Sequence, residues 1–110
     1  MTRTFIETSS LKRFIDDRGI GGDSLLREIQ ASIMEDPERG ALIPGTGGTR
    51  KLRVADESRG KGKRGGFRVI YFDLADREKT YLLLIYQKGR QDNLSQDEKE
   101  EIRNLVRVLK

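Results

Sequence analysis

The chain has 110 residues, no cysteine and no histidine, and its 22 Lys and Arg exceed its 18 Asp and Glu by a formal charge of +4. This length predicts a single domain, residues 1–110, that buries a core without covalent cross-links. The composition excludes disulfide frameworks, thiolate metal sites and histidine-dependent catalysis, so any chemistry must come from Lys, Arg, Tyr, Asp or Glu.

Apolar runs in this sequence are short. The longest, VIYF and YLLLIY, fall far below the roughly 20 apolar residues that a membrane-spanning helix needs, and the N-terminus has no signal-peptide pattern. We therefore expect a cytoplasmic protein with no membrane association.

The first elements are a strand and a helix. The segment TRTFIET, residues 2–8, predicts a short strand, and SSLKRFIDD, residues 9–17, predicts a helix. Its serines suit an N-cap, and Leu11, Phe14 and Ile15 share one side of the helix. This side should face the core.

A second helix follows a glycine-rich break. It is expected to start at Asp23 or Ser24 and to end near Glu35, before Pro37. The two helices should form an antiparallel pair, and residues 37–49 are expected to be a loop.

Three further strands are predicted in the segments RKLRVAD, GFRVIYFDL and TYLLLIYQK, which turn-like sequences separate. The last two are joined by the short polar segment ADREK, which favours an antiparallel meander.

The last element is a helix. Ser95 and Glu98 have the spacing of a capping box at its start, and the apolar stripe that follows consists of Ile102, Leu105, Val106 and Leu109. The order strand, helix, helix, three strands, helix predicts an α+β domain with a small, antiparallel-rich sheet and helices packed on one face.

Positive charge is concentrated in one part of the chain. Residues 50–68 contain eight basic and two acidic residues, which leaves 14 basic and 16 acidic residues elsewhere. A charge gathered on one patch attracts a polyanion, and nucleic acid is the obvious candidate.

Alternation along the strands places these charges. Leu52 and Val54 share one face of their strand, and Lys51 and Arg53 share the other. Arg68 alternates with core residues on the next strand. The last strand ends in Tyr86 and Lys88, which point the same way, so the pattern favours a basic concave surface.

The segment GKGKRG, residues 60–65, fits the dinucleotide pattern G-x-G-x-x-G. That pattern functions only between a strand and a helix, and here a strand follows it. The sequence therefore predicts no dinucleotide cofactor.

Three segments together, GTGGTRKLRVA, RGKGKRGGFRVIYF and LLLIYQKGRQDNLSQDEKEEIRNLV, resemble the HigB-type toxins of the RelE superfamily. The resemblance implies a RelE-like fold and a type II toxin–antitoxin system. It further implies a ribosome-dependent mRNA endonuclease, or mRNA interferase, that cleaves by attack of the 2′-hydroxyl and leaves a cyclic phosphate. The partners implied are the ribosome, mRNA in its A site and a cognate antitoxin with a helix-turn-helix, and any contact with DNA would be indirect through that antitoxin.

The resemblance and the chemistry of RNA cleavage select candidate residues. Arg53 and Arg68 are expected to neutralise the charge of the phosphorane, because guanidinium groups bind phosphate in a bidentate manner. Lys88 is the preferred general base, since neighbouring cations favour loss of its proton, and Tyr86 is the second candidate. The remaining RNA-binding candidates are Lys51, Lys61, Lys63, Arg64 and Arg90. No cofactor and no metal are expected.

Two other interpretations remain. A small basic module could bind RNA or the ribosome without chemistry, and the basic patch could dock an acidic protein partner.

Overall fold

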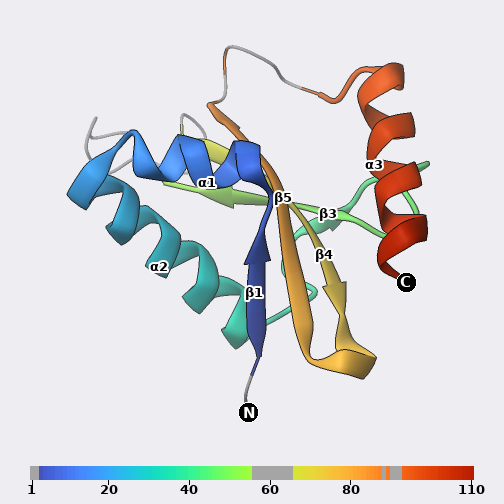
Figure 1. Cartoon of the computed structure of the whole chain (residues 1–110), viewed down its shortest axis with the longest axis horizontal. Coiled ribbons are helices and arrows are strands. Elements are labelled where there is room, and N and C mark those ends of the chain that lie inside the picture. Colours follow the sequence, from blue (N-terminus) through green and yellow to red (C-terminus); the bar gives the residue numbers. More distant parts are fainter. Residues whose placement is uncertain (1–2, 56–65, 88, 90–92) are drawn as a thin grey trace.

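The computed structural model describes residues 3–55, 66–87, 89 and 93–110 (Figure 1). The helices are α1 (Ser9–Asp16), α2 (Gly19–Glu35) and α3 (Gln96–Leu109), and the strands are β1 (Thr4–Glu7), β2 (Ala41–Leu42), β3 (Arg50–Val54), β4 (Phe67–Leu74) and β5 (Lys79–Gln87). A short 3-10 turn, η3 (Ala75–Arg77), connects β4 to β5.

The strands form one five-stranded sheet in the order β1-β5-β4-β3-β2. The pairs β3–β4 and β4–β5 are antiparallel, so the predicted meander is confirmed. β1 lies at the edge and pairs with β5 in parallel. The predicted α+β class and the antiparallel-rich sheet are both confirmed.

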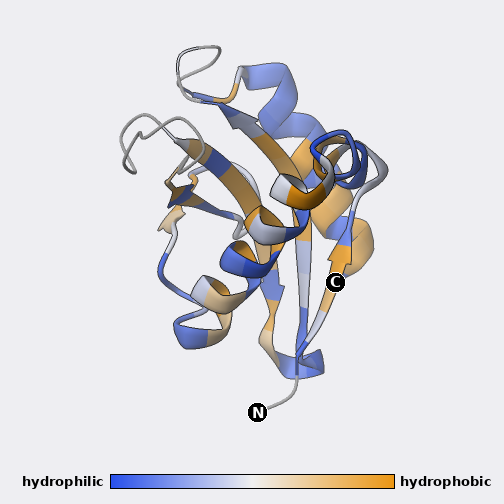
Figure 2. Cartoon of the chain, turned by 90° about the vertical axis from the view of Figure 1, so that its left-hand side faces the viewer, coloured by the Kyte–Doolittle hydropathy of each residue, from blue (hydrophilic) through white to orange (hydrophobic). Residues whose placement is uncertain are grey.

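Both faces of the sheet are covered by helices. Leu11 and Ile15 of α1 and Ile29 of α2 belong to one buried cluster, with Val69 and Tyr71 of β4. Figure 2 shows α1 and α2 in front of strands that are largely hydrophobic. These two helices pack on one face, as expected.

The last helix packs on the opposite face, and the expectation that all helices share one face is wrong for α3. Ile102 and Val106 of α3 form a second buried cluster with Ile70 and Phe72 of β4. The physical reason lies in β4, whose residues Phe67 to Phe72 are all buried. A central strand that is apolar on both faces needs a cover on each of them.

Two predicted boundaries also differ from the structure. α2 begins at Gly19, ahead of the expected Asp23 or Ser24, because its first turn packs against α1. A Cβ on Gly22 would lie 2.0 Å from the carbonyl oxygen of Ile15, so only glycine allows this contact. Residues 37–49 were expected to be a loop, yet they contain β2, which pairs with β3.

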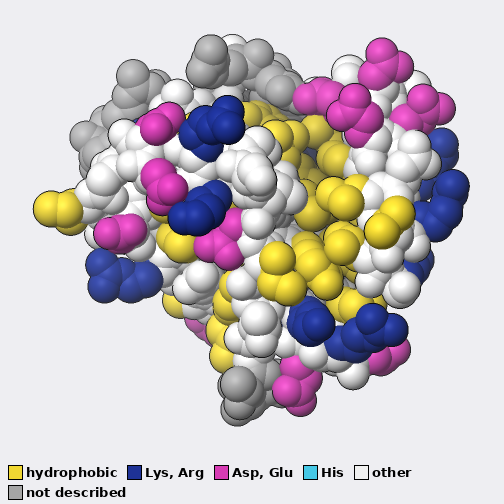
Figure 3. Space-filling model, in the orientation of Figure 1, with side chains coloured by type: hydrophobic (Ala, Val, Ile, Leu, Met, Phe, Trp, Pro, Cys, Tyr) yellow, Lys and Arg dark blue, Asp and Glu magenta, His cyan; other side chains and the backbone are white. Residues whose placement is uncertain are grey.

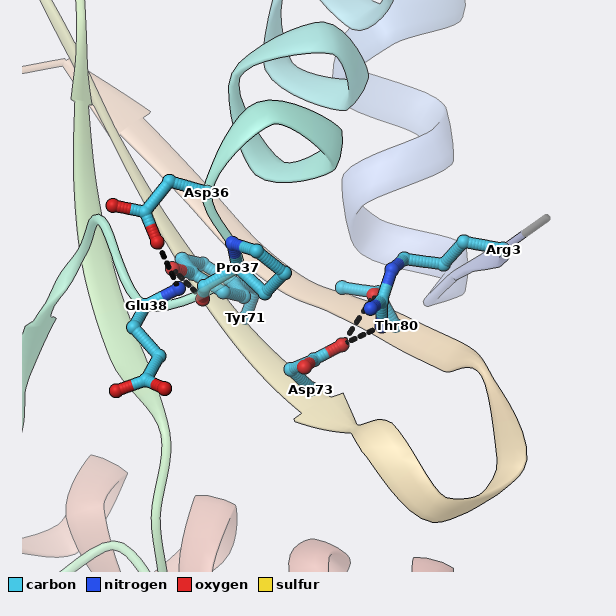
Figure 4. Close-up of polar contacts among 7 residues, drawn as sticks. All are labelled: Arg3, Asp36, Pro37, Glu38, Tyr71, Asp73 and Thr80. Carbon is cyan, nitrogen blue, oxygen red and sulfur yellow. Dashed lines mark hydrogen bonds and ion pairs between the residues drawn. The ribbon is translucent and has the colours of Figure 1, made fainter. Parts of the chain in front are cut away.

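Tyr71 anchors the chain that leads into β2 (Figure 4). Its hydroxyl donates to the carbonyl oxygen of Pro37 at 2.7 Å and accepts from the backbone N–H of Gly40 at 3.0 Å. Arg50 donates to the carbonyl oxygens of Glu38 and Gly40 at 3.0 and 2.8 Å. The segment that follows α2 is thereby held against β3 and β4.

A second polar network fixes the N-terminal edge of the sheet (Figure 4). Arg3 forms an ion pair with Asp73, and Thr80 donates to the same carboxylate at 2.8 Å. Arg3 directly precedes β1, Asp73 lies on β4 and Thr80 lies on β5. The network therefore ties β1 to the centre of the sheet.

Within the described part of the chain, no helix is long and apolar enough to cross a membrane.

Candidate nucleic-acid interface

Three polar side chains form a row across the face of the sheet that α3 covers in part. Arg53 of β3 lies opposite Arg68 of β4, and Arg68 lies opposite Tyr86 of β5. Directly opposed residues of antiparallel strands point to the same face, with Cβ atoms about 4.5–5.5 Å apart. The register therefore places both arginines and the tyrosine side by side.

The three residues differ in exposure. Arg53 is exposed, whereas Arg68 is only 6% and Tyr86 only 8% accessible. One guanidinium nitrogen of Arg68 donates to the carbonyl oxygen of Phe67 at 3.2 Å. Arg53 can thus reach a ligand directly, while Arg68 places its charge beneath the surface.

Like charges directly opposite each other destabilise a sheet. The register nevertheless places Arg53 and Arg68 directly opposite each other. A pairing that breaks a local rule in this way is typical of functional sites.

A cleft of about 290 Å³ opens beside this row. Its walls come from the β2 segment, β3, the end of β5 and the start of α3, and the lining residues are Ala41, Leu42, Ile43, Pro44, Lys51, Arg53, Tyr86, Asn93, Leu94 and Lys99. This volume lies at the small end of the range for ligand sites, so the cleft suits a short stretch of an extended chain.

The charged side chains among the described lining residues of the cleft all have one sign. Lys51, Arg53 and Lys99 contribute three cations, and none of the described lining residues is acidic. Asp73, the acidic residue of β4, pairs with Arg3 and lies one residue out of phase with Phe72, which faces α3. The carboxylate is therefore on the opposite face of the sheet.

The predicted alternation along β3 agrees with the structure. Leu52 and Val54 face α1 and α2 in the first cluster, and Lys51 and Arg53 face the cleft. Tyr86 joins them there, whereas Arg68 lies in the same row but is not among the lining residues. The predicted residues Lys61, Lys63, Arg64, Lys88 and Arg90 lie outside the described part of the chain.

Sequence reasoning missed two parts of the cleft. The first is the β2 segment, because a strand of two residues leaves no periodic pattern. The second is Lys99, which the capping box could have indicated. Ser95 accepts from the N–H of Glu98 at 3.1 Å and Glu98 accepts from the N–H of Ser95 at 2.9 Å, so the start of α3 is fixed and Lys99 follows at once.

In the part of the chain that the structure describes, no group of three or more His, Cys, Asp or Glu side chains could hold a metal ion.

The structure thus describes a small α+β protein whose sheet and last helix border a cleft with three cations among its described lining residues. A sequence model of the RelE toxin of the RelE/RelB toxin–antitoxin system matches residues 2–110. The chain belongs to this family of toxins, which are components of type II toxin–antitoxin systems and are typically ribosome-dependent endoribonucleases. Membership implies a cognate partner, a RelB-type antitoxin.

Proposed function

We propose that this protein is a HigB-type mRNA endonuclease that acts on the ribosome in the cytoplasm, and that the basic cleft holds the scissile ribose phosphate. The observation that carries the proposal is the convergence of Lys51, Arg53 and Lys99 around a small cleft with no acidic residue among its described lining residues. A polyanionic chain fits this charge pattern, and a neutral or cationic ligand does not.

Cleavage of RNA by its own 2′-hydroxyl has four requirements. The hydroxyl must lie in line with the phosphorus, lose its proton, attack a phosphorus whose growing negative charge is neutralised, and expel a 5′-oxygen that gains a proton. The oxygen–phosphorus bond to the 5′-oxygen breaks as the bond to the 2′-oxygen forms, which yields a cyclic phosphate. Fixed cations meet the third requirement without titrating.

We assign charge neutralisation to Arg53 and Arg68. Arg53 is exposed at the cleft and can grip the phosphate with its guanidinium fork. Arg68 is buried beside it and adds positive charge from within the sheet, where the dielectric is lower and the field is stronger. The buried arginine thus pre-organises the site without leaving its place.

For the general base we propose Lys88, with Tyr86 as the second candidate. The position of Tyr86 supports it as a candidate base, because its side chain lines the cleft and lies opposite Arg68. Lys88 follows Tyr86 by two residues in the sequence. A general base contributes about 10²- to 10⁴-fold to the rate.

The proposal extends to the partners. We propose that Lys61, Lys63, Arg64 and Arg90 bind the backbone of message or ribosomal RNA and that no cofactor is required. The antitoxin is proposed to carry a helix-turn-helix, so that contact with DNA is indirect.

The decisive experiment compares Arg53→Gln with Arg27→Gln in cleavage of ribosome-bound message. Both residues are exposed, and Arg27 lies on α2, which covers the opposite face of the sheet. Removal of one pre-organised charge donor should lower the cleavage rate by about 10²- to 10³-fold, and Arg27→Gln should leave it unchanged. Equal rates for the two variants would refute the assignment of the cleft.

The same assay separates the candidate bases. Loss of cleavage in Lys88→Ala together with activity in Tyr86→Phe supports Lys88, and the reverse supports Tyr86. If both variants cleave normally, the base lies elsewhere. Detection of 2′,3′-cyclic phosphate ends in the product tests the mechanism itself.

The alternative function, a basic RNA- or ribosome-binding module without chemistry, is favoured by the same charge pattern. Expression of the protein alone in a bacterium distinguishes the two functions. A nuclease stops growth and produces cuts within translated messages that Arg53→Gln abolishes, whereas a binding module produces no cuts.

A further inference from the structure

We propose that one flank of α3, formed by Lys99, Arg103, Arg107 and Lys110, binds the sugar-phosphate backbone of the RNA that leaves the cleft. This inference rests on the proposed function, because it extends the same site along the helix. It assigns an RNA-binding role to four residues beyond the sheet.

The spacing places these cations together. Lys99, Arg103, Arg107 and Lys110 follow one another at intervals of four, four and three residues. Such intervals bring side chains to the same side of a helix. We name these four residues the basic flank.

Packing fixes the direction of the basic flank. Ile102 and Val106 are buried against the sheet, and Arg103 and Arg107 each follow one of them directly. Lys99 lines the cleft together with Lys51 and Arg53. The basic flank therefore begins at the cleft and continues along α3 away from it.

Most acidic residues of α3 lie outside the basic flank. Figure 3 shows Lys and Arg side chains along the outer side of the region that α3 occupies, and Asp and Glu side chains gathered near its N-terminal end. Glu100 pairs with Arg103 at 3.7 Å, with both side chains about half exposed. A surface pair of this kind contributes little, so a phosphate can replace the carboxylate.

A charged helix surface has simpler explanations, and two of the four residues have one. Arg107 and Lys110 lie at the C-terminal end of α3, where the helix dipole stabilises cations. Lys99 is the fourth residue of α3, where the dipole disfavours a cation, and Arg103 lies at the middle of the helix, where the dipole has little effect. The other long helix, α2, contains a single basic residue, Arg27, so a basic flank is particular to α3.

The dimensions suit an extended chain. Lys110 lies eleven positions after Lys99 in the sequence, which corresponds to about 16 Å along a helix. A path of this length runs beside several consecutive phosphates. The ligand we infer is thus the RNA backbone, recognised by its charge and without regard to its bases.

The test compares two double variants with the same change in net charge. Arg103→Gln/Arg107→Gln alters the basic flank, and Arg13→Gln/Arg27→Gln alters exposed arginines on α1 and α2, on the opposite face. The probe is a single-stranded 2′-O-methyl RNA of about 12 nucleotides, within the usual range of site sizes. It has no free 2′-hydroxyl, so binding is measured without cleavage.

The basic-flank variant should bind this probe more weakly, and the slope of log affinity against log salt should fall by about 1.4, or 0.7 for each lost phosphate contact. The control variant should keep the slope of the wild type. Equal slopes in the two variants would overturn the inference.

Two further probes locate the ligand. An oligonucleotide of about 3 nucleotides, short enough for the cleft alone, should bind the basic-flank variant and the wild type equally. If the variant loses affinity for an RNA duplex as well, the basic flank also accepts folded ribosomal RNA; if it loses affinity for the single strand alone, the ligand is the message.

Cleavage separates this inference from the proposed function. If Arg53→Gln abolishes cleavage and the basic-flank variant binds RNA like the control, the inference fails and the proposed function stands. If Arg53→Gln cleaves normally while the basic-flank variant binds RNA more weakly than the control, the cleft is wrongly assigned and the RNA-binding role of the basic flank stands.

Discussion

Tyr71 shows how one side chain positions a wall of the cleft. Its ring is fully buried in the cluster beneath α1 and α2, and its hydroxyl holds the chain between α2 and β2. Burial raises the pKa of Tyr71 above its usual value of 10.0, and the hydrogen bond from Gly40 lowers it by a smaller amount. Ionisation of this phenol is therefore harder in the folded than in the unfolded protein.

The stability of the protein should depend on this phenol at high pH. Because the folded-state pKa is raised, its contribution is complete below the unfolded pKa of about 10 and is lost as pH rises through the folded value. Tyr71→Phe should lower the free energy of unfolding by about 1–3 kcal/mol at pH 7, because Pro37 and Gly40 lose a buried partner.

Urea denaturation at neutral pH and at about pH 11 measures this effect, since the reference pKa of tyrosine is about 10. The difference between wild type and Tyr71→Phe should shrink at the higher pH, because only the wild type has this phenol to ionise. Tyr81→Phe, at a less buried tyrosine, serves as the control. An equal difference at both pH values would contradict the role of Tyr71.

The contact between α1 and α2 depends on adjacent glycines with different surroundings. A Cβ on Gly21 would meet no atom within 4 Å, whereas a Cβ on Gly22 would lie 2.0 Å from the carbonyl oxygen of Ile15. Neither glycine has a positive φ angle, so space alone distinguishes the two positions.

Alanine substitutions at these positions should have opposite effects. Gly21→Ala should raise the free energy of unfolding by about 0.4–1 kcal/mol, because it restricts the unfolded chain. Gly22→Ala should lower it by about 1–3 kcal/mol or more, because the helices must separate to admit the methyl group. Thermal unfolding monitored by circular dichroism compares the two, and two stabilising substitutions would show that the helices pack differently.

α3 is the element that joins the core to the site. Its buried residues Ile102 and Val106 complete the second cluster, and its first turn brings Lys99 to the cleft. The side chain of Val106 also lies close to Gly47, where a Cβ would be 3.2 Å from it. The helix, the sheet and the segment that follows β2 are therefore one packed unit around the cleft.

At the scale of the whole molecule, the ends of the described chain are fixed to opposite sides of one sheet. Arg3 reaches Asp73 on β4, 70 residues away in the sequence, and its side chain is 6% exposed against 14% for the carboxylate. Between the sheet and α3, Figure 3 shows a hollow in which hydrophobic side chains gather. β1, at the edge of the sheet, is held there by its pairing with β5 and by the ion pair between Arg3 and Asp73.

Loss of one partner of this pair should destabilise the molecule strongly. Asp73→Ala leaves the buried charge of Arg3 without a counterion and should lower the free energy of unfolding by about 3–5 kcal/mol. The double variant Arg3→Met/Asp73→Leu removes both charges and should recover most of that loss. Urea denaturation compares them, and equal losses in the single and double variants would show that the ion pair is not the cause.

Local sequence predicted most elements because their signals are local. The capping box of Ser95 and Glu98 and the apolar stripe of α3 depend on neighbours within a few residues, and the structure confirms both. Alternation along β3 likewise predicted that Leu52 faces the helices and Arg53 faces away from them. The excess of basic residues within residues 50–68 is also evident from the sequence alone.

What the sequence determined by itself was therefore the class of fold, the order of the elements apart from β2, and the face of β3 on which the cations lie, since periodicity and charge are properties of single segments. Tertiary structure decided that α3 covers the second face, that Arg68 is buried between Arg53 and Tyr86, and that Lys99 meets Lys51 across a cleft. These features depend on strand register and on the need to cover a sheet that is apolar on both sides. Both bring together residues that are far apart in the chain, so local sequence does not reveal them.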